Sequence, residues 1–417
     1  MKKIIVEGGK KLSGIIKISG AKNSAVALIP AAILCDGEVT INNVPKISDI
    51  DSLVEILEFL GAKVKRNGSS ITINASNIEN KEIPEEISKK LRASYYFMSA
   101  LLGKYKNVEM YFPGGCNIGK RPIDQTLKGF KALGAEINEK ENKYKIYAKK
   151  LIGGQIDLDM PSVGATINAI LASVRAVGTT TITNAAKEPE IVNVADFLNK
   201  MGAKINGAGT STITIEGVNK LKSTSIDVIP DRIEAGTYVI IGCLLGNNLK
   251  IDNLNSNHIE ALLNKLKEAN ANIEIHDNYI IANQSNNLKS IKVITEGYPG
   301  FATDLQQPLT TLLTQCNGIS ELTEMIYENR FNNVEYLNKM GADIKIKDRT
   351  IYINGKNNLK GNIVKATDLR AGACLIIAAL IAEGQTIIED IEHVLRGYEN
   401  IIEKLSNVGA KIEYEEI

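Results

Sequence analysis

The sequence predicts an α/β protein of two domains, each containing three copies of one structural unit. Three observations carry this prediction: a length of 417 residues, a short motif that recurs six times, and a constant order of helices and strands between its copies. A chain of this length exceeds what one ordinary hydrophobic core accommodates, which favours two domains.

The recurring motif ends a helix and begins a strand. In five copies it reads Gly-Ala after an apolar residue, and in the fourth copy Asn replaces the Gly. The six marker residues are Gly61, Gly134, Gly202, Asn270, Gly341 and Gly409. Successive markers lie about seventy residues apart, a longer period than that of common solenoids. Because Gly and Asn suit the left-handed conformation that often ends a helix, each marker is expected to close one helix.

Each unit is expected to run in the order helix, strand, helix, strand, strand. In the first unit an apolar helix over residues 25–34 precedes a short β-branched strand at 39–41. An amphipathic helix over residues 50–60 follows, and strands at 63–65 and 70–73 close the unit. The other units repeat this pattern.

The six units divide most simply between the third and the fourth copy, near residues 220–230. A strand at residues 3–6 precedes the first unit and could complete the other domain. We therefore expect one three-unit domain over residues 21–229, and a second, discontinuous domain formed by residues 1–20 and 230–417.

Composition argues against several classes of partner. The net charge of +1 gives no electrostatic footprint for nucleic acid. No apolar run reaches the roughly eighteen residues of a membrane span. The apolar run after Met1 ends at Glu7, which is too short for a signal peptide. We therefore expect a cytoplasmic protein without a membrane or nucleic-acid partner.

Cysteine and histidine usage argues against a disulfide framework and against a metal site. The five cysteines include no Cys-x-x-Cys pair, and the three histidines have no metal-like spacing. Neither a metal nor another cofactor is expected.

Arginine is scarce and unevenly placed. Only nine of the 49 Lys and Arg residues are Arg, and six of them lie where helices are expected to open. These six are Arg92, Arg121, Arg232, Arg330, Arg370 and Arg396. Surface salt bridges or helix caps would explain any one of them. Their concentration favours a cleft between the two domains that binds a small polyanion, since guanidinium groups and helix starts both favour phosphate and carboxylate.

The segment at residues 113–122 is predicted to be a loop with a chemical role. It holds three glycines and two prolines, which exclude a helix or a regular strand, and such a loop can act as a lid. Cys116 lies among small and polar residues, close to Lys120 and Arg121, a setting that suits thiol chemistry. The other four cysteines lie in apolar contexts and are interpreted as small buried residues.

Motifs over nearly the whole chain carry a family resemblance. They occupy residues 20–23, 92–94, 113–124, 161–166, 188–192, 303–304, 328–331, 367–372 and 396–399. In sequence and order they closely resemble those of the UDP-N-acetylglucosamine 1-carboxyvinyltransferases. The resemblance implies the enolpyruvyl transferase fold, a two-domain inside-out α/β barrel with six α-β-α-β-β repeats, three per domain. It also implies an active site in the cleft between the domains.

The resemblance further implies a reaction. The enolpyruvyl group of phosphoenolpyruvate would move to the 3-hydroxyl of UDP-N-acetylglucosamine by addition and elimination through a tetrahedral intermediate. Phosphate would be released without a metal or other cofactor. This is the first committed step of peptidoglycan synthesis.

Roles for single residues follow from the same resemblance. Cys116 is implied as proton donor, as a residue that bonds covalently to phosphoenolpyruvate, and as the target of fosfomycin. Asp304 is implied as the base near the sugar hydroxyl, although the residues alone leave a helix N-cap equally open. Lys22 and Arg396 complete the catalytic set.

The implied substrate contacts involve both expected domains. The residues for phosphoenolpyruvate are Lys22, Asn23, Cys116, Arg121, Arg330, Arg370 and Arg396. Those for UDP-N-acetylglucosamine are Arg92, Arg121, Pro122, Ile123, Asp124, Gln125, Ser162, Val163, Gly164, Asp304 and Ile326.

Two alternatives are weighed against this reading. A 3-phosphoshikimate 1-carboxyvinyltransferase would share the fold but lack the cysteine loop. A catalytically silent nucleotide-sugar-binding paralogue would not need Lys22, Cys116, Asp304 and Arg396 together. Both are therefore disfavoured.

Overall fold

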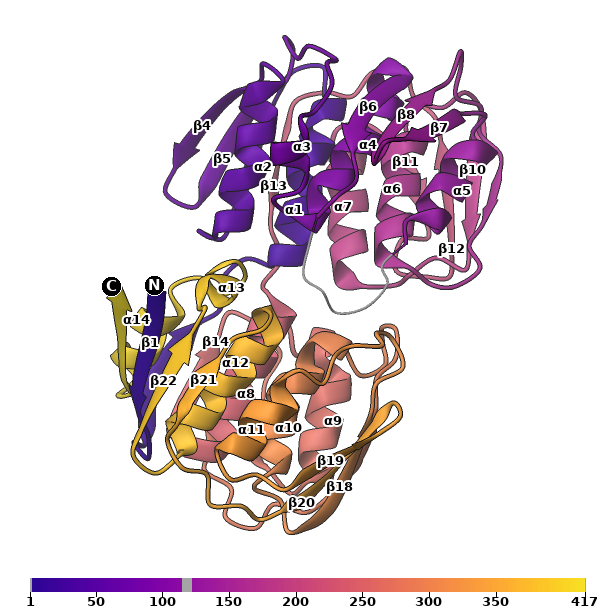
Figure 1. Ribbon diagram of the computed structural model, residues 1–417. Helices are drawn as coiled ribbons and strands as arrows, with labels where there is room; N and C mark the ends of the chain where they lie inside the picture. The colour runs from indigo at the N-terminus through magenta and orange to yellow at the C-terminus, as the bar shows by residue number, and fades with distance from the viewer. Residues whose placement is uncertain (1, 115–121, 417) are drawn as a thin grey trace. The chain divides into compact units, whose positions relative to one another are not determined.

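The computed structural model describes residues 2–114 and 122–416. Within these ranges the chain packs into two compact units (Figure 1). The N-terminal unit comprises residues 20–114 and 122–229, and the C-terminal unit comprises residues 2–19 and 230–416. Cys116 and Arg121 lie outside the described residues.

Three sheets and their helices form the N-terminal unit. Its helices are α1 (Lys22–Ala31), α2 (Ser48–Phe59), α3 (Glu85–Ser88), α4 (Tyr95–Tyr105), α5 (Asp124–Ala132), α6 (Val163–Ser173) and α7 (Pro189–Lys200), with 3-10 turns η1 (Ala32–Leu34) and η2 (Arg92–Ser94). Its strands are β3 (Glu38–Asn42), β4 (Lys63–Asn67), β5 (Ser70–Asn74), β6 (Asn107–Tyr111), β7 (Glu136–Lys140), β8 (Lys143–Tyr147), β9 (Gln155–Asp157), β10 (Thr179–Thr183), β11 (Lys204–Asn206), β12 (Thr212–Glu216) and β13 (Thr224–Asp227). They form the sheets β13-β3-β5-β4, β6-β8-β7 and β11-β12-β10-β9.

The C-terminal unit repeats this plan. Its helices are α8 (Arg232–Leu245), α9 (Glu260–Glu268), α10 (Gln306–Leu313), α11 (Asn333–Lys339), α12 (Leu369–Ile381), α13 (Glu392–Leu395) and α14 (Ile401–Asn407), with 3-10 turns η3 (Ser256–Ile259) and η4 (Thr303–Leu305). Its strands are β1 (Lys2–Glu7), β2 (Leu12–Lys17), β14 (Gly246–Asp252), β15 (Asn272–Ile275), β16 (Tyr279–Asn283), β17 (Lys292–Ile294), β18 (Gly318–Thr323), β19 (Ile344–Lys347), β20 (Thr350–Gly355), β21 (Ile363–Lys365), β22 (Gln385–Glu389) and β23 (Lys411–Glu416). They form the sheets β21-β22-β1-β23, β15-β16-β14-β2 and β17-β18-β20-β19.

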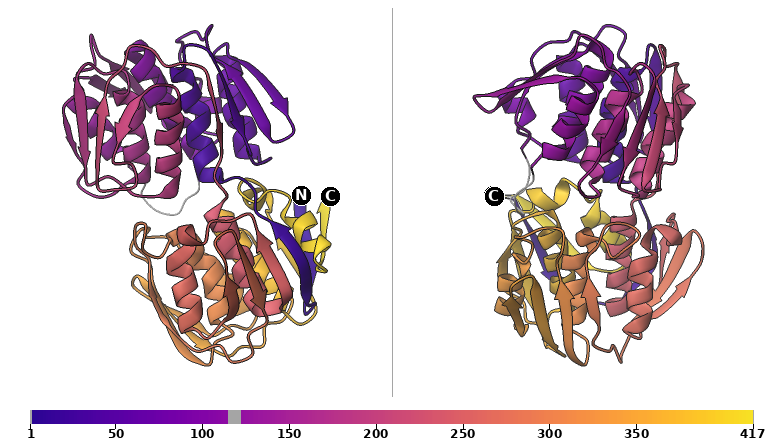
Figure 2. Two further views of the ribbon diagram at one scale, coloured as in Figure 1. Left: turned by 180° about the vertical axis from the view of Figure 1, so that it is seen from behind. Right: turned by 90° about the vertical axis from the view of Figure 1, so that its right-hand side faces the viewer.

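The helices form the centre of each unit and the sheets surround them (Figures 1 and 2). Every residue of α6 from Ala165 to Ser173 is buried, and α8 is buried from Ile233 to Leu245. A helix that is apolar on all sides must be enclosed by other elements. The strands instead alternate buried and more exposed residues, so each sheet turns one face to these helices.

The marker residues of the repeat behave as predicted. Gly61, Gly134, Gly202, Gly341 and Gly409 have φ between 88° and 105°, and Asn270 has φ 63°. All six therefore hold the left-handed conformation that ends a helix, and this prediction is confirmed.

The predicted order of elements within a unit was incomplete. Short strands β9, β17 and β21 precede α6, α10 and α12, and each pairs in parallel with the strand that follows that helix. Strands of three residues are too short to show a period of two in the sequence.

Two of the six arginines do not open a helix as predicted. Arg330 lies in the loop before Asn332, the N-cap of α11, and Arg396 is the C-cap of α13. In contrast, Arg92 begins η2, Arg232 begins α8 and Arg370 is the second residue of α12.

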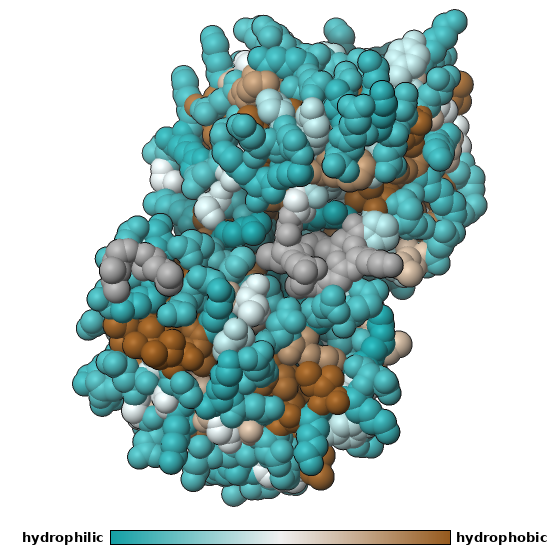
Figure 3. Space-filling view, viewed as in Figure 1, coloured by the Kyte–Doolittle hydropathy of each residue, from teal (hydrophilic) through white to brown (hydrophobic). Residues whose placement is uncertain are grey.

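No helix within the described ranges is long and apolar enough to cross a bilayer. On the face drawn in Figure 3, hydrophilic side chains cover most of the surface of each unit, and the apolar patches are separate from one another.

Candidate active site

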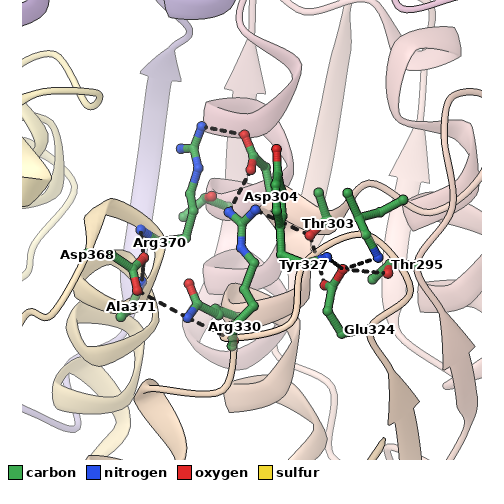
Figure 4. Close-up of polar contacts among 12 residues, drawn as sticks. Thr295, Thr303, Asp304, Glu324, Tyr327, Arg330, Asp368, Arg370 and Ala371 are labelled. Atoms are coloured by element: carbon green, nitrogen blue, oxygen red, sulfur yellow. Dashed lines mark hydrogen bonds and ion pairs between the residues drawn. The ribbon is translucent and has the colours of Figure 1, made fainter. Parts of the chain in front are cut away.

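A carboxylate held by two guanidinium groups forms the centre of the candidate site in the C-terminal unit (Figure 4). Arg330 Nη2 donates to Asp304 Oδ1 at 2.6 Å, and Arg370 Nη2 donates to Asp304 Oδ2 at 3.1 Å. The Arg330 and Arg370 side chains are only 4% and 5% exposed, whereas Asp304 is 26% exposed. The acid therefore presents its open side to solvent between two buried cations.

Three separate segments bring these charges together. Asp304 lies in η4, Arg330 in the loop before α11, and Arg370 in the first turn of α12. Asp368 caps α12, because its Oδ1 accepts from the backbone N–H groups of Arg370 at 2.9 Å and Ala371 at 3.0 Å. This cap fixes the backbone from which the Arg370 side chain extends.

Asp304 is not a helix N-cap. The N-cap of η4 is Ala302, and the Asp304 carboxylate accepts from the two arginines instead. The capping alternative that the residues alone left open is therefore excluded.

The charges of this cluster shift one another's ionisation. Burial would raise the pKa of Asp304, but the guanidinium groups of Arg370 and Arg330 outweigh burial and hold that pKa well below its usual range. Burial opposes the charge on Arg370, while Tyr398 and the carboxylates of Asp304 and Asp231 raise its pKa. The cluster therefore keeps Asp304 ionised and Arg370 protonated throughout the neutral range.

The Tyr398 ring lies against the Arg370 guanidinium. The Arg370 guanidinium carbon lies 5.3 Å from the centroid of the Tyr398 ring, within the range of a cation–π contact. The Tyr398 hydroxyl lies 2.9 Å from Thr237 Oγ1 of α8, and the residue is 1% exposed. Thus α8 holds the ring that carries the guanidinium.

The N-terminal unit contributes a buried ion pair. Lys22, the first residue of α1, places its Nζ 2.7 Å from Asp49 Oδ2. Their side chains are 14% and 7% exposed. Asp49 lies in the first turn of α2, so it ties the start of one helix to the start of the next. Sequence reasoning selected Lys22 and Asn23 and missed Asp49, whose only signal was an acid one residue before the predicted amphipathic helix at 50–60.

The residues expected to contact the nucleotide sugar lie around three helix starts of the N-terminal unit. Ser162 caps α6 by accepting from Ala165 N at 3.3 Å. The Arg92 guanidinium carbon lies 5.5 Å from the Tyr95 ring centroid, and a Cβ at Gly164 would overlap the Tyr95 hydroxyl. Gly164 therefore lets Tyr95 approach the first turn of α6.

The start of α5 holds a second group of these residues. Asp124 is its first residue, and Gln125 Oε1 accepts from Asp159 N at 2.8 Å. Pro122 is exposed and Ile123 is 8% exposed. In the C-terminal unit, Ile326 is 41% exposed, which suits a contact with a ligand.

The four cysteines other than Cys116 are free and buried, as predicted. Burial raises the pKa of the Cys243 and Cys316 thiols to about 12 and that of Cys374 to about 11. Burial also raises the pKa of Cys35. A thiol with a raised pKa is a poor nucleophile near neutral pH, so none of these four suits thiol chemistry.

No group of three or more His, Cys, Asp or Glu side chains in the described part of the chain could hold a metal ion.

Comparison with known proteins decides the family. The family model described as EPSP synthase (3-phosphoshikimate 1-carboxyvinyltransferase) matches residues 6–405. A UDP-N-acetylglucosamine 1-carboxyvinyltransferase 2 of Oceanobacillus iheyensis is 50% identical over 417 residues, which cover 100% of this chain and 97% of the relative. A UDP-N-acetylglucosamine 1-carboxyvinyltransferase 1 of Streptococcus agalactiae is 49% identical over 415 residues, with 99% of each chain covered.

The chain belongs to the UDP-N-acetylglucosamine 1-carboxyvinyltransferase family. It is an enolpyruvyl transferase, and the resemblance drawn from the motifs is confirmed.

Solved structures of similar proteins identify the fold of this enolpyruvyl transferase. The enolpyruvyl transferase NikO from Streptomyces tendae aligns with a TM-score of 0.90 and 25% identity over 99% of both chains. An EPSP synthase from Acinetobacter baumannii aligns with a TM-score of 0.75 and 20% identity over 100% of both chains. The predicted enolpyruvyl transferase fold is therefore confirmed.

Proposed function

We propose that this enolpyruvyl transferase moves the enolpyruvyl group of phosphoenolpyruvate to the 3-hydroxyl of UDP-N-acetylglucosamine and releases phosphate. The observation that carries the proposal is the buried pair of arginines on either side of Asp304, because two fixed cations beside a partly exposed acid suit an anionic substrate and a proton transfer. The names of relatives about 50% identical over the whole chain support the same substrates.

Each part of the cluster has a role in the proposed reaction. Arg330 and Arg370 bind the carboxylate of phosphoenolpyruvate and stabilise the charge that develops in the tetrahedral intermediate. Lys22, Arg121 and Arg396 hold its phosphate, with Asn23 beside them. Cys116 delivers a proton to the methylene carbon while Asp304 accepts one from the sugar hydroxyl. The active site is proposed to form between the two units.

The sugar is bound by residues of both units in this proposal. The starts of η2, α5 and α6 supply most of them in the N-terminal unit, and Asp304 and Ile326 supply the rest. The set is Arg92, Arg121, Pro122, Ile123, Asp124, Gln125, Ser162, Val163, Gly164, Asp304 and Ile326.

The pKa of Asp304 must rise before this side chain can act as an effective base. A carboxylate whose pKa lies far below neutrality is a weak base, so the ligand-free cluster is poorly suited to proton abstraction. Phosphoenolpyruvate brings a second carboxylate to Arg330 and Arg370. Sharing the two guanidinium groups between two acids raises the pKa of Asp304 and makes it a stronger base once the substrate is bound.

The proposal places the reaction in the cytoplasm as the first committed step of peptidoglycan synthesis. It makes Cys116 the target of fosfomycin. No cofactor takes part.

The experiment that tests the proposal measures phosphate release from phosphoenolpyruvate with UDP-N-acetylglucosamine, with shikimate 3-phosphate, and with no acceptor. Release only with the nucleotide sugar is expected, and fosfomycin pretreatment is expected to abolish it. The variant Asp304→Asn should lower kcat by about a thousandfold, since it removes the base while leaving a side chain of the same shape.

Other outcomes each favour a different conclusion. Release with shikimate 3-phosphate would identify the sister activity. Nucleotide-sugar binding without release would identify a silent binding protein. Sugar-dependent release that survives fosfomycin would keep the reaction but remove the role of Cys116.

A further inference from the structure

A buried carboxylate outside the family motifs lies beside the candidate site. Glu324 directly follows strand β18 and is 1% exposed. Three residues of chain separate it from the start of the motif at 328–331, and it packs against η4, which carries Asp304 (Figure 4).

Both oxygens of this carboxylate accept hydrogen bonds. Glu324 Oε1 accepts from Thr295 Oγ1 at 3.0 Å and from the backbone N–H groups of Ile326 and Tyr327 at 2.8 and 3.1 Å. Glu324 Oε2 accepts from Thr303 Oγ1 at 2.8 Å. One side chain therefore holds the loop that carries Ile326 and the hydroxyl next to Asp304.

A chain of hydrogen bonds runs from Arg330 through Thr303 to Glu324, and its direction follows from which groups can donate. Thr303 Oγ1 donates its single hydroxyl proton to Glu324 Oε2, because the guanidinium of Arg330 only donates and cannot accept that proton. The lone pairs of Thr303 Oγ1 are then available to Arg330, whose Nη1 donates to that oxygen at 3.3 Å. The other terminal nitrogen, Arg330 Nη2, donates to Asp304. Arg330 is thus held at two points, and one of them depends on Glu324.

We propose that Glu324 is a positioning residue: it directs the Thr303 hydroxyl so that Thr303 accepts from Arg330, which fixes Arg330 against Asp304. It also holds the loop that presents Ile326. The catalytic consequence rests on the proposed function, whereas the placement of Arg330 is a matter of geometry that can be measured without any reaction.

Two substitutions separate this role from general support of the fold. Thr303→Val removes the relay hydroxyl and leaves the contacts of Glu324 with Thr295 and the loop intact. Glu324→Gln keeps the shape but turns an amide N–H toward Thr303, which reverses the hydrogen bond. The Thr303 hydroxyl proton must then point either toward Arg330 Nη1, where it repels that donor, or into a position without an acceptor. Thr303→Ser keeps the hydroxyl and serves as the rescuing variant.

The expected kinetics follow from these differences. Thr303→Val and Glu324→Gln should each lower kcat about tenfold, and the double variant should lose about the same tenfold, because both changes break one chain. Thr303→Ser should remain within about twofold of wild type. Neither Thr303→Val nor Glu324→Gln should raise KM for UDP-N-acetylglucosamine, since Gln keeps an amide oxygen toward the backbone N–H groups of Ile326 and Tyr327.

A matched control lies one residue before Glu324. Thr323 Oγ1 is 2.8 Å from Thr350 Oγ1 across two strands, and no described contact joins that hydroxyl to Asp304. Thr323→Val removes a threonine hydroxyl at the end of strand β18, next to Glu324, and should leave kcat unchanged. Wild-type kcat in Thr303→Val, or losses that multiply to about a hundredfold in the double variant, would overturn the proposal.

Crystal structures of wild type and Glu324→Gln provide the test that does not depend on activity. In the variant, Arg330 is expected to lose its contact with Thr303 and to move away from Asp304. An unchanged Arg330–Asp304 arrangement would overturn the positioning role. If wild type releases no phosphate in the presence of the nucleotide sugar, the proposed function fails, and this structural comparison alone decides the inference.

Discussion

Two buried carboxylates in the C-terminal unit are both paired with cations, yet their pKa values shift in opposite directions. Asp304 is paired with two arginines, and its pKa lies well below the usual range. Glu234 in the first turn of α8 is paired with Lys404 at 2.6 Å, and its pKa is raised to about 7. An ion pair alone therefore does not determine how a buried acid ionises.

The number of cations explains the difference, because burial raises the pKa of both acids. The Glu234 side chain is 3% exposed, so desolvation dominates, and one ammonium group with a backbone N–H of Ser19 at 2.8 Å does not offset it. The nearby Asp231 carboxylate raises the Glu234 pKa further. Asp304 is 26% exposed and has two guanidinium groups. The pKa of Asp304 is therefore lowered, which keeps this acid ionised, whereas the pKa of Glu234 is raised.

The largest effect is expected from a substitution that leaves Asp304 with only one of its two cations. Arg370→Met should raise the pKa of Asp304 and lower kcat/KM by about a thousandfold, since it removes a guanidinium aimed at developing charge. It should also reduce the free energy of unfolding by about 3 kcal/mol, because a buried ion pair loses a partner. Phosphate-release kinetics and urea unfolding measure the two effects.

An exposed Arg–Asp pair with a shorter separation than the 3.1 Å of Arg370 and Asp304 is the control for Arg370→Met. Arg66 Nη1 lies 2.6 Å from Asp51 Oδ1, but the two side chains are 43% and 63% exposed. Arg66→Met should leave kcat/KM unchanged and cost less than about 1 kcal/mol of unfolding free energy. Equal losses in the two variants would mean that burial does not distinguish these pairs.

The Glu234 pair is tested through the pH dependence of stability. A carboxyl whose pKa is raised in the folded state binds its proton more tightly when folded, so its contribution is largest below its ordinary pKa of 4.5 and is lost as the pH rises to about 7. The shift corresponds to about 3 kcal/mol. Wild type should therefore lose that much stability relative to Glu234→Gln between pH 4.5 and pH 8, measured by urea unfolding.

The charged groups around Glu234 and its partner Ser19 remain in the Glu234→Gln variant. They are Lys404, Asp231 and Glu399. Glu335→Gln, which removes an exposed acid paired with Lys339 at 2.6 Å, is the matched control and should show no such pH dependence. A pH-independent difference between wild type and Glu234→Gln would show that folding does not raise the pKa of this acid.

A smaller change sharpens the account of Arg370. Tyr398→Phe keeps the ring beneath the guanidinium and removes the hydroxyl bonded to Thr237. The Tyr398 hydroxyl also hydrogen-bonds Arg370, so the guanidinium loses one neutral partner, while Thr237 Oγ1 still donates to Ile233 O at 2.8 Å. The expected loss is about 1 kcal/mol of unfolding free energy, with kcat/KM lowered by a few-fold at most. A loss as large as that of Arg370→Met would mean that the hydroxyl, and not the ring, holds the arginine.

The repeat could be predicted from sequence because it depends on local rules. A left-handed residue must end each helix, and the sequence shows this directly at Gly61 and its five counterparts. Four of the six singled-out arginines lie in the described part of the C-terminal unit, where two of them meet at Asp304. The scarcity of Arg was therefore a usable signal for the site.

The partners of those arginines could not be predicted in the same way. Asp304, Arg330 and Arg370 are distant in sequence, and only the packing of η4, the loop before α11 and the start of α12 brings them together. Glu324 gave no sequence signal beyond following an apolar strand. Tyr398 lies in the motif at 396–399, but nothing in the sequence assigned it a role of its own. Their roles depend on burial and on hydrogen-bond direction, which a single sequence does not contain.

The pairing of β1 has a consequence for rearranging the gene. Strand β1 lies beside β23, with Lys2 opposite Glu416, so the two ends of this sequence are neighbours (Figures 1 and 2). Where the chain passes between the units, Asp231 N donates to Ser19 O at 2.9 Å and Ala21 N donates to Ile229 O at 2.7 Å. A circular permutant that joins the ends by a short linker and opens the chain at residues 229–230 would encode each unit as one uninterrupted segment, in tandem.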